Sequence, residues 1–506
     1  MRMLDLTPVL RAYARLRMAR LARLDPVESQ RHQLLKLVRR AANTRFGRAH
    51  DFARVRSVVD FQARVPLRRY EEFWRDWWAP RFPVVANETW PGPAPFFALS
   101  SGTTSGRTKY IPVTPAMRRS NEKAATDTLL FHLASRPRSR LMSGKTLMLG
   151  GSTALAREAD GVYSGDLSAI AAKTASRWTR PYTLPDPETM LIDDWEEKLD
   201  RMARAAVAAR VTGLTGTPSW VLILLERIAA LRKGAPLPDL DLYVHGGISF
   251  APYRKRFREL LGDGPDMREV YAASEGFVAS ADRDYGEGLR LNLGHGIFFE
   301  FVPVDELDAP NPIRHWIADA EIGVNYAIVL STCAGAWSYV VGDTVRLVTR
   351  DPPRVLVTGR TSYGLSAFGE HLIAEEIETA VAAAAEAIGA TIPDYSVAAE
   401  IPAQAGALGR HVFVVEFAPA MADGDALVRF AAHLDRELVR LNADYAAHRR
   451  DDTGLDAPTV MPVPPGAFAA WMKSRGKQGG QNKVPRIVHD PELWASLLRF
   501  AKPAHI

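Results

Sequence analysis

Short apolar runs that alternate with helical stretches are the feature that most limits the folds open to this chain. Thr146–Leu149, Leu242–His245 and Ile297–Val302 have the length and composition of buried strands, and each is bounded by glycine or polar residues. Helical patterns, in contrast, cover Ala125–Ser135 and Asp194–Ala209. Alternation of this kind predicts an α/β fold built around a sheet.

The predicted boundary between two domains falls near residue 360. Val355–Thr358 has the pattern of a strand, and Gly359–Gly369 is a loop rich in glycine, serine and threonine. After this loop, Ala374–Ala387 has a strong helix pattern and Val412–Phe417 has that of a strand. Two domains joined by such a loop are typical of proteins in which a site closes by domain motion. We therefore expect a large N-terminal domain over 1–358, a hinge loop over 359–369 and a small α+β C-terminal domain over 370–506.

Composition excludes several classes of protein. Hydrophobic residues make up 47% and charged residues 24% of the 506 residues, which is typical of a globular chain and not of a disordered one. The single cysteine, Cys333, excludes a disulfide framework inside the chain and any zinc site built from several cysteines. Because the sequence has no 18-residue apolar run and no secretory pattern at its N-terminus, we expect a cytoplasmic protein without an integral membrane segment.

The formal net charge of +6 leaves the kind of partner open. It suits an acidic or phosphorylated small substrate as well as nucleic acid. The interleaved aromatic residues of a nucleic-acid groove are missing, so we expect no nucleic-acid partner. Residues 1–60 have a helical and basic pattern, with arginines interleaved with leucines between Leu10 and Leu24. This pattern fits a membrane-surface helix, but a solvated packing helix is its commoner explanation.

The segment from Ser100 to Lys109 is the most informative motif in the sequence. It follows Phe96–Leu99, an apolar run with the pattern of a strand. Backbone N–H groups at glycines and the hydroxyls of serine and threonine are donors that suit a polyphosphate, and a lysine adds charge. The spacing differs from that of a Walker A loop, and an ordinary glycine–serine turn is the competing explanation. The predicted phosphate-binding residues are Ser100, Ser101, Gly102, Thr103, Thr104, Ser105 and Lys109.

A second motif runs from Tyr271 to Gly276. The hydroxyl of Ser274 beside the carboxylate of Glu275 suits a phosphate oxygen together with a Mg²⁺ ion, and Tyr271 offers a flat face to a base. A serine followed by a glutamate is also a common helix start, so this motif is weak by itself.

Two further motifs place a charged side chain near glycine. Asp343 follows Gly342 at the predicted end of a strand, where a carboxylate can accept both hydroxyls of a ribose. The alternative is a plain glycine–aspartate turn. Lys483 lies in a glycine-rich segment near the C-terminus and would bring one positive charge into a cleft when two domains close. Taken alone, that segment is more simply a solvated basic loop.

Taken together and in this order, the motifs resemble the adenylate-forming superfamily. More narrowly, the chain resembles the auxin-responsive Gretchen Hagen family of acyl-acid amido synthetases, including its bacterial members. Ser100–Pro112 is similar to the S-S-G-T-T-x-G-x-x-K-x-I-P signature of that family. Tyr271–Glu275 resembles its Y-A-S-S-E motif, with Ala273 in place of a serine. Gly342-Asp343 falls where its Y-R-x-G-D motif lies, with Val340 in place of the arginine.

The likeness extends over most of the chain. Further segments that resemble the family are Thr44–Gly47 with His50, Val65-Pro66 with Tyr70, Thr217–Trp220, the adenine wall His245–Ile248, the hinge loop from Gly359-Arg360 to Glu370, and Lys483–Arg486. His371 stands where a lysine is common in the family.

The resemblance implies an adenylate-forming fold, with a large N-terminal α/β domain that contains β-barrel-like elements and a small C-terminal lid. The implied reaction uses ATP and Mg²⁺. A carboxylic acid attacks the α-phosphate of ATP, giving acyl-AMP and pyrophosphate, and an amine, usually of an amino acid, then displaces AMP to form an amide. In this scheme Lys483 is catalytic and Glu275 is the Mg²⁺ ligand. The implied nucleotide site combines the phosphate-binding residues above with Gly246, Gly247, Tyr271, Ser274, Glu275, Asp343 and Arg360.

Two other functions stay open at this point. An acyl-CoA synthetase shares the first step, and it differs in that CoA, instead of an amine, triggers the release of AMP. A function of another class is a basic protein whose N-terminal helix binds a membrane or nucleic-acid surface. Salt-sensitive binding to liposomes or DNA without nucleotide turnover would favour that function.

Overall fold

The computed structural model describes two compact units. The described residues are 4–100, 108–150, 155–175, 179–190, 192, 194–248, 250–361, 364–365, 372–400, 409–421, 423–442, 445–446, 449, 455–476 and 483–501. By their contacts, the first unit comprises Met1–Ile248 and Leu260–Val357, and the second comprises Ser249–Glu259 and Thr358–Ile506. The predicted α/β class, with a large N-terminal part and a smaller C-terminal part, is confirmed.

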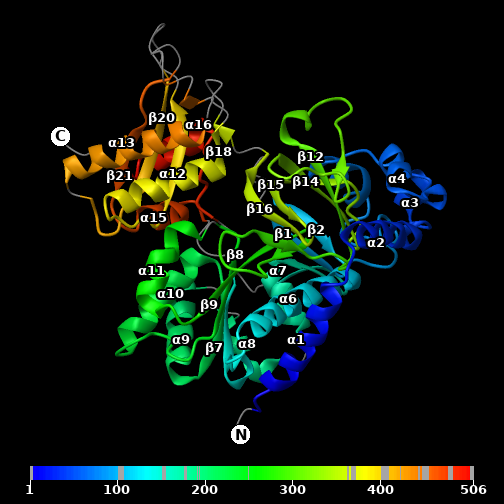
Figure 1. The fold of residues 1–506 in the computed structure, drawn as a ribbon, viewed down its shortest axis with the longest axis horizontal. Helices are drawn as coiled ribbons and strands as arrows, with labels where there is room; N and C mark the ends of the chain where they lie inside the picture. Colours follow the sequence, from blue (N-terminus) through cyan, green and yellow to red (C-terminus); the bar gives the residue numbers. More distant parts are fainter. Residues whose placement is uncertain are drawn as a thin grey trace. The chain divides into compact units, whose positions relative to one another are not determined.

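The first unit is built around a mixed sheet of twelve described strands, in the order β13-β12-β14-β15-β16-β11-β10-β9-β8-β7-β3-β6 (Figure 1). The strands from β6 to β9 pair in parallel and those from β9 to β11, like those from β13 to β15, pair antiparallel. The parallel strands are β3 (Lys145–Leu149), β6 (Thr183–Leu184), β7 (Val211–Gly216), β8 (Leu242–Gly246) and β9 (Asp266–Ala273). The others are β10 (Gly276–Ser280), β11 (Leu289–Leu291), β12 (Ile297–Pro303), β13 (His315–Trp316), β14 (Asn325–Thr332), β15 (Tyr339–Arg350) and β16 (Pro353–Arg360).

Helices cover the parallel half of this sheet. α9 (Trp195–Ala208) and α10 (Pro218–Leu231) pack on each other and contact β6 and β7, whereas α6 (Pro115–Ser135) contacts β9 and β10 (Figure 1). Burial by helices explains why the predicted strands read as continuous apolar runs instead of alternating ones. α6 begins at Pro115 because the hydroxyl of Thr114 accepts the N–H of Met117 at 3.1 Å and proline needs no N–H partner at the first position.

The basic N-terminal segment forms α1 (Thr7–Leu21) and α2 (Pro26–Ala41), as predicted. α1 packs on α6 through buried Ala14. Two arginines fasten it: Arg17 makes hydrogen bonds of 2.8 and 2.7 Å to Asp127, and Arg11 donates to the carbonyl of Ser139 at 2.5 Å. Within the described part of the chain, every helix is too short or too polar to cross a bilayer.

A smaller sheet carries the strands on either side of the predicted phosphate loop. Its order is β2-β1-β5-β4, with β1 (Phe96–Ser100), β2 (Lys109–Val113), β4 (Ala156–Ala159) and β5 (Val162–Gly165). The register of the β1–β2 pair places Ser100 opposite Lys109, so both ends of the loop meet at one point. The remaining short helices of the first unit are α3 (Arg45–Ala49), α4 (Val58–Arg64), α5 (Tyr70–Phe73), α7 (Leu167–Thr174) and α8 (Pro187–Met190).

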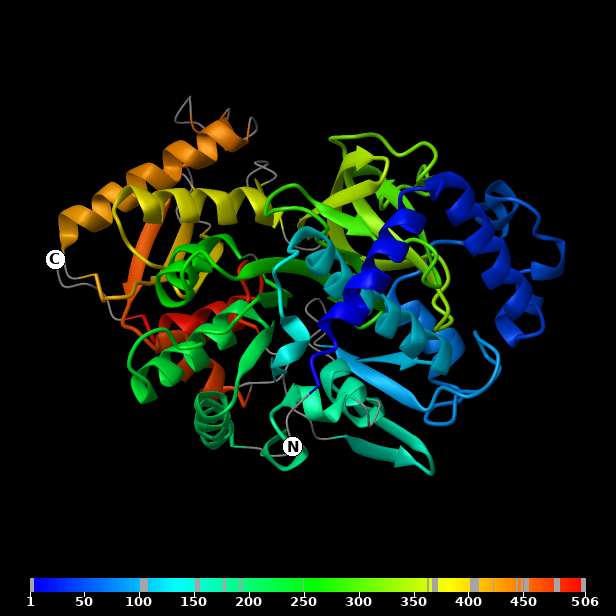
Figure 2. The same ribbon diagram turned by 60° about the horizontal axis from the view of Figure 1, so that its bottom comes forward.

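The second unit is a three-stranded sheet with helices on both faces. β19 (Tyr395–Glu400), β20 (Arg410–Glu416) and β21 (Thr459–Val463) form the sheet, and α12 (Ala374–Ala387) and α13 (Gly424–Leu441) lie side by side in Figures 1 and 2. Along β20, Phe413 and Val415 pack with α12 and α13, while Val414 packs with α15 (Ala467–Ser474) and α16 (Pro491–Leu498). The predicted helix and strand of this part are confirmed. Short elements complete the set: α11 (Arg254–Leu261), β17 (Gly364–Leu365) and β18 (Leu372–Ile373).

Candidate active site

The carboxyl ends of the parallel strands gather two of the predicted motifs. β8 ends at Gly246 and the register pairs Gly246 with Val270, one residue before Tyr271 on β9. A Cβ at Gly246 would clash with the carbonyl oxygen of Val270, and Gly247 has a φ of +87°, so both positions favour glycine. Burial lowers the pKa of neighbouring His245 to about 3, so its ring is neutral at pH 7. Ligands of open α/β sheets bind at this edge.

Ser274 and Glu275 form the turn between β9 and β10. Ala273 pairs with Gly276 across that turn, so the alternative of a helix start is wrong: the chain reverses within two residues, and the strands continue the sheet. The Glu275 side chain is buried, and its Oε1 accepts a hydrogen bond of 3.2 Å from the hydroxyl of Tyr339 on β15.

Asp343 lies inside β15 and not at the end of a strand, so that part of the prediction is wrong. The register of the β14–β15 pair shifts between Ala327 and Val329, which leaves a bulge around Gly342. Gly342 has a φ of +95°, a backbone conformation that glycine adopts without strain. The hydroxyl of Tyr271 donates to Oδ2 of the buried Asp343 at 2.6 Å. The bulge therefore re-aims a carboxylate in mid-strand toward β9.

This tyrosine–aspartate contact shows that the sheet is strongly curved. Three strands, β10, β11 and β16, separate β9 from β15 in the strand order. Neighbouring strands lie about 4.8 Å apart, so β9 and β15 would be about 19 Å apart in a flat sheet. In a flat sheet the two side chains would be too short to meet across that distance, yet their oxygens lie 2.6 Å apart. The curl brings the Tyr271–Glu275 and Gly342-Asp343 motifs together.

Lys109 is held on the face of an aromatic ring beside the phosphate loop. Its ammonium nitrogen lies 5.3 Å from the ring centroid of Tyr70 on α5, within cation–π range. The Tyr70 hydroxyl accepts the N–H of Tyr110 at 2.8 Å, and burial raises the pKa of Tyr70 to about 12. Ser100 and Lys109 are therefore placed, while Ser101, Gly102, Thr103, Thr104 and Ser105 lie outside the described residues.

Tyr339 is the site residue that the sequence reasoning did not single out. Its hydroxyl binds Glu275, and its ring lies 5.9 Å from that of Phe73 on α5, the helix that also carries Tyr70. Burial, followed by the charge of Glu275, holds the pKa of Tyr339 well above its usual value, so the hydroxyl remains a donor. The sequence did contain a clue to Tyr339: it lies four residues before Asp343, at the position of the tyrosine that begins the Y-R-x-G-D motif of the family.

Arg360 and Lys483 belong to the second unit. Arg360 ends β16, and Lys483 is an exposed residue three positions before Arg486, which is anchored to β19 through its backbone. Their approach to the residues of the first unit stays a prediction.

Three family models match successive parts of the chain. The GH3 family N-terminal domain matches residues 16–224, the GH3 family central domain residues 291–360 and the GH3 family C-terminal domain residues 375–492. Together they cover well over half of the sequence. The chain belongs to the GH3 family. This membership confirms the resemblance that the ordered motifs indicated.

Among the curated relatives of this GH3 chain is an indole-3-acetic acid-amido synthetase, GH3.8, of Oryza sativa subsp. indica. It is 28% identical over 342 residues, which are 59% of this chain and 54% of the relative. The jasmonoyl–L-amino acid synthetase JAR4 of Nicotiana attenuata is 22% identical over 50% of this chain and 55% of the relative. The matched part thus spans about half the length of these relatives.

Solved structures show the same fold. A GH3.15 acyl acid amido synthetase aligns with a TM-score of 0.79 at 19% identity, covering 97% of this chain and 96% of the other. A 2-hydroxyisobutyryl-CoA ligase in its postadenylation state aligns with a TM-score of 0.61 at 15% identity, covering 92% and 90%. The GH3 chain therefore has the fold of adenylate-forming ligases.

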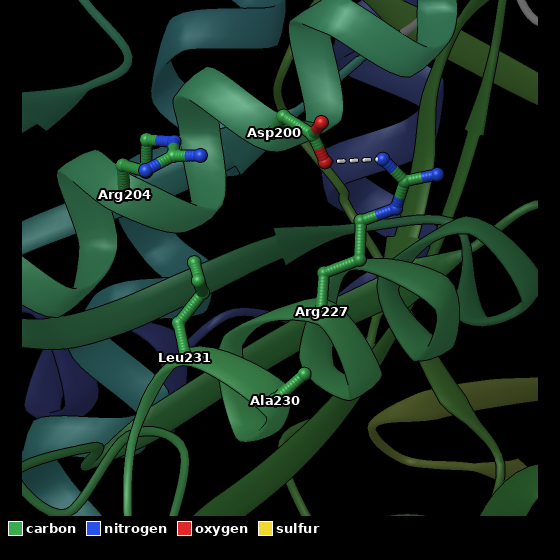
Figure 3. A pocket seen from close by; sticks show the side chains of 5 residues that line it. All are labelled: Asp200, Arg204, Arg227, Ala230 and Leu231. Carbon is green, nitrogen blue, oxygen red and sulfur yellow. Dashed lines mark hydrogen bonds and ion pairs between the residues drawn. The ribbon is translucent and has the colours of Figure 1, made fainter.

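One cavity of the GH3 chain lies away from this site. It measures about 170 Å³ and is lined by Asp200, Arg204, Arg227, Ala230 and Leu231 on α9 and α10 (Figure 3). Arg227 points at Asp200 in Figure 3, at 2.5 Å, and also pairs with Glu196. Because Arg227 is already paired with two carboxylates and the cavity contains none of the predicted site residues, we do not assign it a role in the reaction.

The residues of the GH3 site fit a Mg²⁺ ion that is bound together with a nucleotide. Among the described residues there is no group of three metal-ligating side chains. Mg²⁺ bound with ATP needs only one or two protein carboxylates, because phosphates and water complete its octahedron. Glu275 meets that need, since the Tyr339 hydroxyl orients one of its oxygens and a carboxylate has about four lone-pair positions.

Proposed function

We propose that this protein is an ATP-dependent acyl-acid amido synthetase. It activates a carboxylic acid as acyl-AMP with release of pyrophosphate, and then transfers the acyl group to an amine, that of an amino acid. The observation that carries the proposal is the pair of tyrosine–carboxylate hydrogen bonds, Tyr271 to Asp343 and Tyr339 to Glu275, which unite two motifs at the ligand-binding edge of the sheet. The relatives, which are amido synthetases named for indole-3-acetic acid or acyl acids, support the reaction class.

Each side chain has a role that follows from its chemistry. A carboxylate is a poor electrophile, so the task of the protein is to position the acid against the α-phosphate and to stabilise charge. Lys109 and the donors from Ser100 to Ser105 would hold the outer phosphates, and Asp343 would accept the ribose hydroxyls. Mg²⁺, held by Glu275, supplies neutralisation of phosphate charge.

The remaining roles belong to the nucleobase and the transition state. Gly246 and Gly247 would form a wall for adenine, because glycine allows a base to approach the backbone closely. Tyr271 and Ser274 would complete the nucleotide site. Lys483 would stabilise the charge that develops on the α-phosphate, with Arg360 nearby in the closed enzyme. A single buried thiol, Cys333, suits a reducing, cytoplasmic setting.

An acid-dependent exchange of pyrophosphate into ATP tests the first step. A screen across aryl, indolyl and fatty acids should find acids that support exchange, and Asp343→Asn should weaken the response to each of them. If no acid supports exchange or AMP release in the folded protein, adenylation is not its function.

An acyl-CoA synthetase is the second candidate, because the alignment to the 2-hydroxyisobutyryl-CoA ligase covers 92% of the chain. Both candidates share the first step and differ in the second. AMP release from the enzyme-bound acyl-AMP should accelerate with amino acids for the amido synthetase and with CoA for the alternative. Mass spectrometry of the product, amide or thioester, decides between them.

A further inference from the structure

The segment that follows Lys483 is bridged to β19 in the sheet of the second unit. The N–H of Val397 on β19 donates to the carbonyl of Arg486 at 2.8 Å, and the N–H of Val488 donates back to Val397 at 2.8 Å. Val397 is thereby bridged in parallel to Ile487. The hydroxyl of Ser396 adds a hydrogen bond of 2.6 Å to the carbonyl of Pro485.

The side chain of Arg486 holds this segment in place as a clamp. One guanidinium nitrogen lies 3.0 Å from Oδ1 of Asp394 and donates to the carbonyl of Tyr395 at 3.1 Å. The other terminal nitrogen lies 3.4 Å from the hydroxyl oxygen of Tyr253. The guanidinium also stands 4.5 Å above the ring of Tyr395. Ion pair, backbone acceptor and two aromatic neighbours together leave this arginine a single orientation.

Tyr253 brings a distant part of the sequence into the clamp. It lies in Ser249–Glu259, which comes between β8 and β9 in the sequence but groups with the second unit by its contacts. Its side chain is 2% exposed, and its hydroxyl donates to the carbonyl of Pro393 at 2.8 Å. The segment starts two residues after Gly247, at the end of the proposed adenine wall. The segment that carries Lys483 and the segment Ser249–Glu259 thus share one buried contact within the second unit.

The clamp limits where Lys483 can go. Only Val484 and Pro485 separate it from Arg486, and three extended residues span at most about 11 Å. Pro485 further fixes its own φ. Lys483 itself is exposed, and the segment that directly follows it is anchored to β19. A catalytic cation needs such a support to return to one geometry in every cycle.

We propose that Arg486 is a positioning residue for adenylation: with Asp394 and Tyr253 it fixes the segment that carries Lys483. The proposal rests on the function proposed above. It differs from a purely structural role, in which loss of Arg486 would lower stability and leave the ratio of the two half-reactions unchanged.

A matched cluster in the same unit provides the control. Arg449 donates to Asp435 at 2.9 and 2.8 Å, the hydroxyl of Tyr445 donates to the same carboxylate at 2.8 Å, and Arg449 also reaches the carbonyl of Leu455. This cluster has the same chemistry, an arginine, an aspartate, a tyrosine and a backbone acceptor, at a place 28 or more residues before Lys483 in the sequence.

Arg486→Lys keeps the charge but cannot bridge the three acceptors at once. It should lower acid-dependent ATP–pyrophosphate exchange about ten- to a hundredfold, the range for a lost hydrogen bond to a charged group. The ATP dissociation constant should stay within a few-fold, and conversion of supplied acyl-AMP to amide should persist. Arg449→Lys should leave exchange near that of the wild type. An equal loss of exchange in both variants overturns the proposal.

A double variant separates positioning from an independent effect. If Arg486 acts through Lys483, then Lys483→Ala with Arg486→Lys should be no slower in exchange than Lys483→Ala alone. Effects that multiply would mean that Arg486 acts on the reaction apart from Lys483, and would overturn the proposal.

The pH dependence of ATP–pyrophosphate exchange gives a further test, because a purely structural role of Arg486 would not change it. Burial raises the pKa of Asp394 to about 6, although the charge of Arg486 opposes this rise and that of Glu416 adds to it. The other groups that face Arg486 are Tyr253, Tyr395 and Glu378. Exchange should therefore fall as the pH drops through about 6, because protonated Asp394 releases the clamp. Asp394→Asn should be slow at pH 7.5 and lack this acid limb, while Asp435→Asn keeps it. An unchanged limb in Asp394→Asn overturns the proposal.

Hydrogen exchange read by mass spectrometry tests the clamp without relying on activity. The amides of Val397 and Val488, the two donors of the bridge, should be protected in the wild type and in Arg449→Lys, and should exchange about ten- to a hundredfold faster in Arg486→Lys. Equal protection in both variants overturns the proposal. If the wild type shows this protection but no acid supports pyrophosphate exchange, the proposed function fails while the clamp itself is confirmed as structure.

Discussion

Replacing Asp343 tests the candidate nucleotide site most directly. Asp343 is 8% exposed and its carboxylate accepts a hydrogen bond of 2.6 Å from Tyr271, so the carboxylate is oriented and only slightly hydrated. If it binds the ribose hydroxyls, each charge-assisted hydrogen bond contributes about 1.5–3 kcal/mol. At about 1.4 kcal/mol per factor of ten, Asp343→Ala should raise the KM for ATP about ten- to a hundredfold.

The assay is acid-dependent ATP–pyrophosphate exchange with ATP varied and the acid saturating. Asp343→Asn keeps an acceptor for the Tyr271 hydroxyl. The KM for ATP should therefore rise as in Asp343→Ala, while the loss of stability should be smaller. Asp282→Asn is the control, because Asp282 is a partly buried carboxylate bound by Arg354 at 2.8 Å within the same unit. It should destabilise the fold without raising the KM for ATP. A KM for ATP that stays within twofold in folded Asp343→Ala would refute the assignment of ribose binding.

The partner tyrosine extends the same prediction. Tyr271→Phe removes one donor to Asp343 and should raise the KM for ATP less than Asp343→Ala does. In the double variant the two effects should not multiply, because the hydroxyl acts by orienting the carboxylate. Full multiplication would mean that Tyr271 contacts the nucleotide independently.

Three further predictions concern the rest of the site. Lys483→Ala should lower pyrophosphate exchange about 10²–10³-fold while ATP binding and amide formation from supplied acyl-AMP persist; equal loss in both half-reactions would assign Lys483 to the structure of the lid. Tyr339→Phe removes the 3.2 Å donor to Glu275 and should raise the Mg²⁺ concentration for half-maximal exchange up to about tenfold, whereas Tyr326→Phe, whose hydroxyl accepts the N–H of Glu321, should leave it unchanged. Ser366→Pro, in the predicted hinge outside the described residues, should slow turnover more than it weakens ATP binding, and a loss of thermal stability alone would make the loop a simple linker.

Local patterns in the sequence determined the elements and the donor types. Leu242–His245 and Ala374–Ala387 could be assigned from composition and period, because a buried strand or an amphipathic helix repeats its pattern over neighbouring residues. The hydroxyls, glycines and lysine between Ser100 and Lys109 also pointed to phosphate by residue type alone. These features need no knowledge of what lies across the fold.

Only the tertiary structure decided which distant groups meet. Tyr339 is 64 residues from Glu275 in the sequence, Tyr271 is 72 from Asp343, and Arg486 is 92 from Asp394. No periodic pattern spans such separations, since these contacts depend on strand order, on the curl of the sheet and on the bulge at Gly342. The same reason explains the wrong placement of Asp343 at a strand end: a bulge is set by the partner strand, and the sequence of one strand does not contain its partner.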